Sequence, residues 1–181
     1  MEKGSAETKK IKKIAIIGPE STGKSSLSVQ LADYYKTVWV PEYAREYVGN
    51  LNRKYTLDDV IKISETQHKQ IDEKLKEANK FIFVDTEDVI NKIWCDVVFR
   101  TCPDVIEHRI TNYPFDLYLL LMPDLPWQED PLRENPDKRE HLYSLYKHEL
   151  ENRNLPFSEI SGFNEKRLEN AVKVIEEYFG G

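Results

Sequence analysis

The chain has 181 residues, which is enough for one domain with a full hydrophobic core. A hydrophobic share of 40% and a charged share of 32% are typical of a folded globular protein and exclude a disordered one. The net charge of -6 argues against a protein that neutralises nucleic-acid phosphates or coats an anionic membrane.

The N-terminus begins with a basic stretch that has lysines at positions 9, 10, 12 and 13. We interpret residues 1–13 as a solvated, disordered tail, and the alternative interpretation is a nucleic-acid-binding arm. The remaining chain, residues 14–181, is predicted to form one domain because it contains no linker and no internal repeat.

Beyond the tail, short β-rich runs alternate with longer helical patterns, as in a parallel sheet wrapped by helices. The predicted strands span residues 14–17, 37–40, 81–85, 115–121 and 157–160. The predicted helices span residues 26–35, 56–79 and 87–99, and two more begin near residues 103 and 164. Thr56 and Asp59 have the spacing of a capping box at the start of the second helix. The pattern therefore predicts an α/β fold with a five-stranded parallel sheet.

Residues 123–141 break this alternation. They contain four prolines, Trp127, and charged side chains that include Asp130, Arg133 and Arg139. Long irregular segments in compact domains are usually functional loops, so we predict a lid. Arginines on a lid suit phosphoryl transfer, because a guanidinium group can clamp a transferring phosphate and withdraw with the product. The alternative is an ordinary surface loop with solvated charges.

The strongest motif follows the first predicted strand. It reads Gly18-Pro19-Glu20-Ser21-Thr22-Gly23-Lys24-Ser25 and matches the pattern G-x-x-x-x-G-K-[ST]. The glycines let successive backbone N–H groups face one anion, Lys24 would reach the β- and γ-phosphates, and Ser25 would ligate magnesium. Ser26 continues into a helix whose positive end faces the phosphates. The motif predicts binding of ATP with Mg²⁺, and the alternative is merely a tight strand-to-helix turn.

Two carboxylates follow other predicted strands. Asp85 ends an apolar strand, where the second magnesium carboxylate of a P-loop protein is expected. Glu42 lies just beyond the second strand, on the same carboxyl edge of the sheet. It could take the proton from a substrate hydroxyl that attacks the γ-phosphate. Alternatively, Glu42 and Glu46 only stabilise a helix N-terminus electrostatically.

Several segments together resemble the ribosylnicotinamide kinase domain of the NadR-type NAD-salvage proteins, a branch of the P-loop nucleoside and nucleotide kinases. The resemblance covers nearly the whole chain, from about residue 14 to residue 179. The matching segments are the glycine motif, Glu42-Tyr43-Ala44-Arg45-Glu46-Tyr47-Val48, Phe83-Val84-Asp85-Thr86, Tyr113-Pro114-Phe115-Asp116, and Trp127 followed by Asp130 and Arg133.

This resemblance implies a phosphotransferase that moves the γ-phosphate of ATP to the 5′-hydroxyl of nicotinamide riboside. It implies the three-layer P-loop NTPase fold, with strand order 2-3-1-4-5, and a P-loop kinase domain over residues 14–181. By position, Lys24 and Ser25 would hold the triphosphate and magnesium. Glu42 becomes the better candidate for the general base, and Asp85 would support magnesium or orient the hydroxyl.

The resemblance also implies a substrate site. Trp127 and Tyr43 would stack on the cationic nicotinamide ring, and Asp130 would bind ribose hydroxyls. The substrate-binding residues expected in this way are Glu42, Tyr43, Arg45, Asp85, Trp127 and Asp130.

The lid and the nucleotide base complete the expected site. Arg133 and Arg139 would be the catalytic lid cations, while Gly162 and Phe163, after the fifth strand, would border the adenine. The chain departs from the family at Pro131, where the family tends to have glycine, and this proline would stiffen the lid.

Alternatives to this function and its expected partners follow from the same sequence. Another small hydroxylated molecule is an alternative acceptor, and a regulatory P-loop ATPase or nucleotide-binding interaction module is the alternative class. No apolar segment approaches the roughly 20 residues of a membrane span, and no signal peptide is visible, so we expect a cytoplasmic protein. We expect a small-molecule substrate and no nucleic-acid or membrane partner, and homo-oligomerisation is left open.

Overall fold

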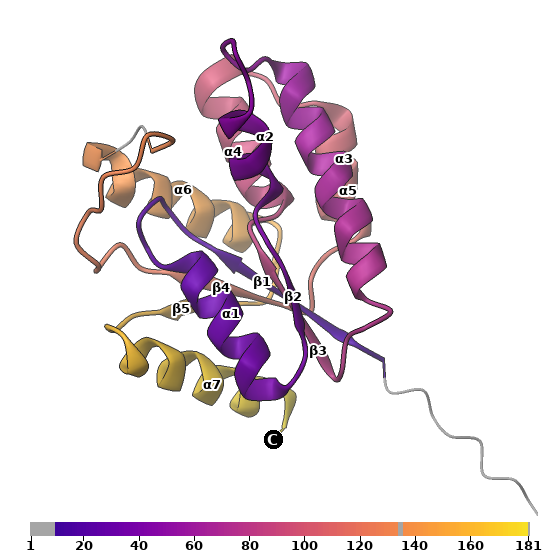
Figure 1. The fold of residues 1–181 in the computed structure, drawn as a ribbon, viewed down its shortest axis with the longest axis vertical. Coiled ribbons are helices and arrows are strands. Elements are labelled where there is room, and N and C mark those ends of the chain that lie inside the picture. The colour runs from indigo at the N-terminus through magenta and orange to yellow at the C-terminus, as the bar shows by residue number, and fades with distance from the viewer. Residues whose placement is uncertain (1–9, 134–135, 181) are drawn as a thin grey trace, which may run out of the picture.

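The strands form one parallel sheet. The computed structural model describes residues 10–133 and 136–180. Within them, the sheet has the order β2-β3-β1-β4-β5, and every neighbouring pair runs parallel (Figure 1). The strands are β1 (Lys12–Ile17), β2 (Val38–Val40), β3 (Phe81–Asp85), β4 (Leu117–Leu121) and β5 (Phe157–Ile160). The predicted fold class and strand order are confirmed.

Helices cover both faces of the sheet, which gives three layers (Figure 1). The α-helices of the described residues are α1 (Lys24–Tyr35), α2 (Tyr43–Gly49), α3 (Leu57–Lys74), α4 (Asp88–Phe99), α5 (Asp104–Asn112), α6 (Arg139–Asn152) and α7 (Glu165–Phe179). Alternate strand residues point to opposite faces. Ile14 and Ile16 of β1 therefore pack in the cluster with α1 and α7, whereas Ala15 and Ile17 pack in the other cluster.

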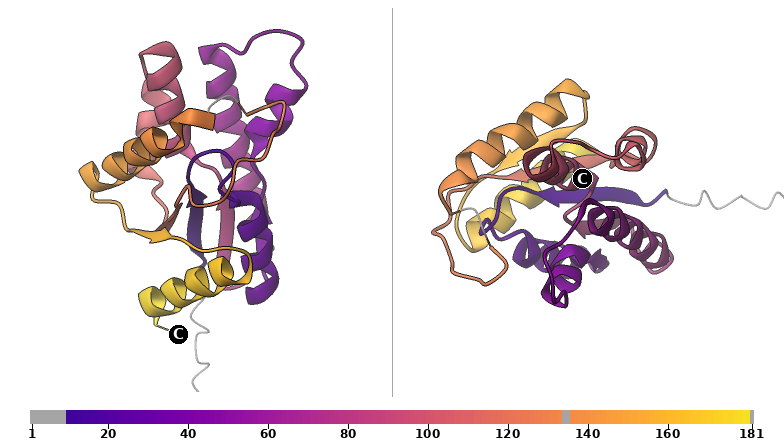
Figure 2. Two further views of the ribbon diagram at one scale, coloured as in Figure 1. Left: turned by 90° about the vertical axis from the view of Figure 1, so that its left-hand side faces the viewer. Right: turned by 90° about the horizontal axis from the view of Figure 1, so that it is seen from above.

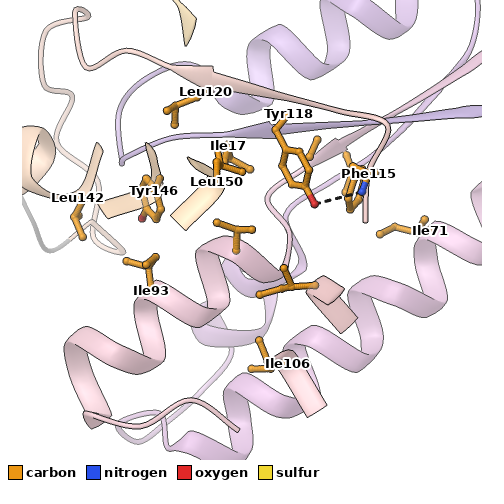
Figure 3. Packing of buried hydrophobic residues seen from close by; sticks show 14 of the residues in the cluster. Ile17, Ile71, Ile93, Ile106, Phe115, Tyr118, Leu120, Leu142, Tyr146 and Leu150 are labelled. Atoms are coloured by element: carbon orange, nitrogen blue, oxygen red, sulfur yellow. Dashed lines mark hydrogen bonds between the residues drawn. The ribbon is translucent and has the colours of Figure 1, made fainter. Parts of the chain in front are cut away.

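The second cluster joins the sheet to α3, α4, α5 and α6 and is the larger of the two (Figure 3). Tyr118 of β4 lies in it, fully buried, and its hydroxyl accepts the Phe115 N–H at 3.3 Å. Tyr146 and Leu150 bring α6 onto this face. Because β4 and β3 are buried on both sides, both strands read as continuous apolar runs in the sequence.

The first strand begins earlier than predicted. β1 starts at Lys12, so Lys12 and Lys13 are part of the sheet and not of a tail. Asp116 explains this extension, because its carboxylate accepts the Lys13 N–H at 2.8 Å and pairs with the Lys12 ammonium at 3.3 Å. Positions 1–9 of the predicted tail lie outside the described residues.

Two helices are missing from the predicted set. α2 has only seven residues and begins two positions after Pro41. A helix at this place is expected only under the alternative interpretation of Glu42 and Glu46. α6 follows a 3-10 turn, η1 (Pro136–Lys138), so the last residues of the predicted lid are helical. The irregular segment is therefore residues 122–133 as far as it is described, with positions 134 and 135 outside the described residues. No helix in the described ranges is long and apolar enough to span a membrane.

Candidate active site

The segments that follow the strands gather around one cavity. Its volume is about 950 Å³, and it is lined by residues from the loop after β1, the segment after β2, the lid and the segment after β5. Parallel strands place their carboxyl ends at one edge, which is where open α/β sheets bind ligands. The predicted site residues that line the cavity are Gly18, Glu20, Ser21, Thr22, Gly23, Lys24, Ser25, Ser26, Glu42, Arg45, Arg133 and Phe163.

The loop after β1 has the backbone of an anion-binding site. Gly18 has φ +148°, and a Cβ atom there would lie 2.8 Å from the Leu121 carbonyl oxygen. Gly23 has φ +80° and is followed at once by α1, whose first residue is Lys24. The helix dipole and the first backbone N–H groups of α1 thus face the cavity. Lys24 Nζ donates to the Pro19 carbonyl at 3.0 Å, so the ammonium group folds back over the loop.

Ser25 and Asp85 meet beside this loop. Ser25 Oγ donates to Asp85 Oδ2 at 2.5 Å, and Asp85 is fully buried at the end of β3. Burial raises the pKa of Asp85, while the Lys24 ammonium and the Ser25 hydroxyl lower it. A hydroxyl and a carboxylate oxygen are hard ligands that suit Mg²⁺, which proteins usually hold through one or two such groups together with phosphate oxygens and water. The residues present therefore fit a nucleotide-bound magnesium ion.

Glu42 faces the same cavity from the N-terminus of α2. Burial raises the pKa of its carboxyl group, the Lys24 ammonium lowers it, and Asp85 raises it further. A carboxyl group with a raised pKa is a stronger base once it is ionised, as general-base catalysis requires.

Gln67 of α3 fixes the position of this carboxylate, and the sequence did not point to it. Its Oε1 accepts the Tyr43 N–H at 2.9 Å, and its Nε2 donates to the Pro41 carbonyl at 3.1 Å and to the Asp85 carbonyl at 3.3 Å. Gln67 is 4% exposed, so it ties the end of β2 to the end of β3 from inside the core. Glu42 lines the cavity, whereas Asp85 is not among the lining residues and lies behind Ser25, which is.

The lid lies beside the phosphate loop (Figure 2) and contacts it at Ser21. Ser21 Oγ accepts the Gln128 N–H at 2.9 Å and lies 3.5 Å from Arg133 Nη1, while Arg139 Nη1 donates to the Ser21 carbonyl at 3.4 Å. Arg139 also donates to the Leu125 carbonyl at 2.8 Å. Both predicted lid cations are therefore brought to the phosphate loop, although only Arg133 lines the cavity.

Arg45 lines the cavity, but its guanidinium group is paired with another predicted substrate residue. Arg45 forms an ion pair with Asp130, which joins α2 to the lid. The Leu132 N–H and this arginine lower the pKa of Asp130. Trp127 lies under the Arg139 guanidinium, 6.0 Å from the ring centroid. Neither Trp127 nor Asp130 is among the cavity-lining residues.

Tyr43 and Gly162 also lie outside the set of lining residues, next to Glu42 and Phe163, which belong to it. The roles of Tyr43, Trp127 and Asp130 in substrate binding stay predictions.

A different aromatic pair does line the cavity. Tyr55 and Trp94 pack edge to face, with ring centroids 4.9 Å apart. Val48, Val97 and Leu132 line the same end and make it apolar. No sequence pattern indicates this pair, because Tyr55 lies in a loop and Trp94 in the middle of a helix.

The fold and this geometry define a P-loop nucleotide-binding protein whose cavity is lined by the phosphate loop and by an apolar set of residues. The family model described as AAA domain matches residues 13–167. The chain therefore belongs to this AAA domain family.

Similarity to known proteins extends over most of the chain. The trifunctional NAD biosynthesis/regulator protein NadR of Escherichia coli is 30% identical over 177 residues, and so is the NadR protein of Salmonella typhimurium. These matches cover 94% of this chain and 43% of each relative. The chain thus spans less than half the length of the curated relatives it matches.

Solved structures share the fold at lower identity. The crystal structure of a NadR protein in complex with NR has a TM-score of 0.83 at 22% identity, and covers 94% of this chain and 52% of that protein. Deoxyadenosine kinase from M. mycoides has a TM-score of 0.62 at 16% identity, with 91% and 99% of the two chains covered. The sheet and its helices are therefore those of P-loop kinases.

Proposed function

We propose that this protein is an ATP-dependent small-molecule kinase that phosphorylates nicotinamide riboside on its 5′-hydroxyl and forms nicotinamide mononucleotide. The observation that carries the proposal is the position of Glu42 in the cavity that the phosphate loop also lines. A protein that only binds nucleotide needs no carboxylate at the acceptor side. The identity to NadR and the NadR structure with NR support this choice of acceptor.

The phosphate side of the reaction is assigned to the loop and α1. In this proposal, the backbone N–H groups of residues 18–25 and the Lys24 ammonium hold the β- and γ-phosphates. Ser25 and Asp85 would hold Mg²⁺, which neutralises charge on the transferring phosphoryl group when it is bound. Arg133 adds a guanidinium group from the lid to the same cavity.

The acceptor side is assigned to Glu42 and the aromatic pair. Glu42 accepts the proton of the attacking hydroxyl, so that the new O–P bond forms as the bond to ADP breaks. Tyr55 and Trp94 line the apolar end of the cavity, and a cationic pyridinium ring is attracted to aromatic side chains. This assignment predicts a preference for a nucleoside with a flat cationic base over one with a neutral base.

Acceptor-dependent turnover tests the proposal. ADP release from MgATP is measured with nicotinamide riboside, with adenosine and with no acceptor. We expect strong stimulation by nicotinamide riboside and none in the Lys24→Ala variant, which loses the phosphate ligand. Slow hydrolysis that no acceptor stimulates would instead indicate a regulatory ATPase and refute the kinase.

A further inference from the structure

A buried arginine connects the separate walls of the nucleotide site. Arg167 of α7 is 4% exposed and lines the cavity. Its Nη1 donates to the Thr22 carbonyl at 3.0 Å, and its Nε donates to the Gly162 carbonyl at 2.8 Å. Its Nη2 lies 3.5 Å from the Met122 carbonyl and forms an ion pair with Asp124. All three guanidinium nitrogens thus have partners. These partners belong to the phosphate loop, to the loop after β5, and to residues 122–124, where the lid begins.

The bond to Thr22 acts on the phosphate loop from behind. A trans peptide unit is planar, so its C=O and the N–H of the next residue point in opposite directions. When Arg167 holds the Thr22 carbonyl, the Gly23 N–H is directed away from Arg167. Gly23 lines the cavity, has φ +80° and directly precedes α1, so its N–H belongs to the row of amides that faces an anion.

Asp124 completes the connection. Its Oδ2 accepts the Gly162 N–H at 2.7 Å, so both polar groups of the Gly162 backbone are bound by the Arg167–Asp124 pair. Gly162 has φ +108°, and the next residues, Phe163 and Asn164, line the cavity. The same pair therefore fixes the base of the lid and the loop after β5.

Burying the Arg167–Asp124 pair at this place does not by itself favour folding. Removing a guanidinium group from water is unfavourable unless its hydrogen bonds and charge are matched. Burial lowers the pKa of Arg167, and Asp124 raises it. An apolar side chain could fill the same volume beneath the loops, but it could not orient three carbonyl groups.

We propose that Arg167, supported by Asp124, is a positioning residue for the nucleotide, which orients the Gly23 amide toward the phosphates and holds the phosphate loop in register with the loop after β5. The proposal deepens the proposed function and rests on its nucleotide site, but not on the identity of the acceptor. It also implies that loss of Arg167 weakens binding of the triphosphate, although Arg167 and its partner Thr22 are 145 positions apart in the sequence.

Calorimetric titration of Arg167→Lys with MgATP and with magnesium tripolyphosphate tests this role. Lysine keeps the charge that pairs with Asp124, but its single nitrogen with three N–H donors cannot serve the three carbonyls and Asp124 together, as the planar guanidinium group does. We expect both dissociation constants to rise about tenfold or more, because hydrogen bonds from a charged group to these carbonyls are lost. In turnover, KM for ATP should rise while KM for the acceptor stays within about twofold. Lys166→Ala is the matched control, since Lys166 is an exposed neighbour on the same helix and its ammonium group pairs with Glu169.

The outcomes separate this proposal from the proposed function. If the wild-type protein binds no MgATP, the proposed function fails. If the wild-type protein binds and a folded Arg167→Lys variant binds both ligands within twofold of it, only the positioning role is overturned. Should Arg167→Lys not fold, Asp124→Asn carries the test. That variant keeps the side-chain size, and unchanged MgATP affinity in it would overturn the role.

Discussion

Replacing Gly18 with alanine tests whether the phosphate loop depends on a glycine-only backbone. The new Cβ atom would lie 2.8 Å from the Leu121 carbonyl oxygen and 3.2 Å from the Leu121 Cβ atom. Leu121 cannot move away easily, because β4 is paired with β1 on one side and with β5 on the other. The phosphate loop, which is less constrained than the sheet, must shift instead.

The size of the effect follows from two contributions. Backbone strain for a residue other than glycine at φ +148° costs about 1–3 kcal/mol. Overpacking against a fixed backbone adds about 1–3 kcal/mol, part of which the shift of the loop relieves. A total of about 2–5 kcal/mol corresponds to a fall in Tm of about 5–15 °C for a domain of this size. Because the shift moves the amides that face the phosphates, MgATP affinity should fall at least tenfold.

Thermal unfolding and calorimetric MgATP titration check both expectations. Gly49→Ala is the matched control, because a Cβ atom there meets only Leu132 Cδ1, at 3.5 Å. Alanine in a helix is favoured over glycine by up to about 1 kcal/mol, so this control should melt at or slightly above the wild-type temperature. A Gly18→Ala variant with wild-type Tm and wild-type affinity would refute the account of the loop.

Four further predictions concern carboxyl groups and the metal site. Glu42→Gln should lower kcat by about 10²-fold or more, with little change in MgATP affinity. The control Glu46→Gln should leave both quantities unchanged. If Glu42→Gln has the same kcat as the wild type, Glu42 is not the general base and has only an electrostatic role. Because burial raises the pKa of Glu42, the acid limb of the wild-type pH–rate profile should lie above the ordinary value of 4.5, and a limb at or below that value would contradict this. Ser25→Ala should raise the Mg²⁺ concentration needed for half-maximal activity, and an unchanged magnesium titration would remove Ser25 from the metal site. Burial raises the pKa of Glu87 well above 4.5, so the folded state binds its proton more tightly than the unfolded chain does. The wild-type free energy of unfolding, measured with urea, should therefore fall as pH rises from about the ordinary pKa of 4.5 to the raised pKa of the folded state. Glu87→Gln should flatten this pH dependence. Parallel plots of unfolding free energy against pH for the variant and the wild type would be inconsistent with a buried titrating carboxyl group.

The features that could be predicted well from the sequence are those that depend on residues close together in the chain. The glycine motif carries its own backbone requirement, and the apolar runs of β3 and β4 identify strands that are buried on both faces. Parallel order then brings Asp85 to Ser25, although 60 positions separate them. This contact could be predicted because both residues follow strands of a known topology.

The features that escaped prediction depend on where distant side chains point. Gln67 and Arg167 lie on amphipathic helices, where a polar residue is normally expected to face solvent. Only packing shows that each is turned inward to bind backbone carbonyls. The family resemblance placed Trp127 at the substrate; in the structure its ring lies under the Arg139 guanidinium, and its role at the substrate stays a prediction. Trp94 lines the cavity from α4, and helical periodicity alone cannot distinguish a core tryptophan from one that lines a site.

The most direct measurement of the central claim is the ratio of nicotinamide mononucleotide formed to ADP released, in a reaction that contains only the protein, MgATP and nicotinamide riboside. Both products are separated by chromatography and identified by mass. The account predicts a ratio of one throughout the time course and no mononucleotide with Lys24→Ala. ADP release without mononucleotide would contradict it.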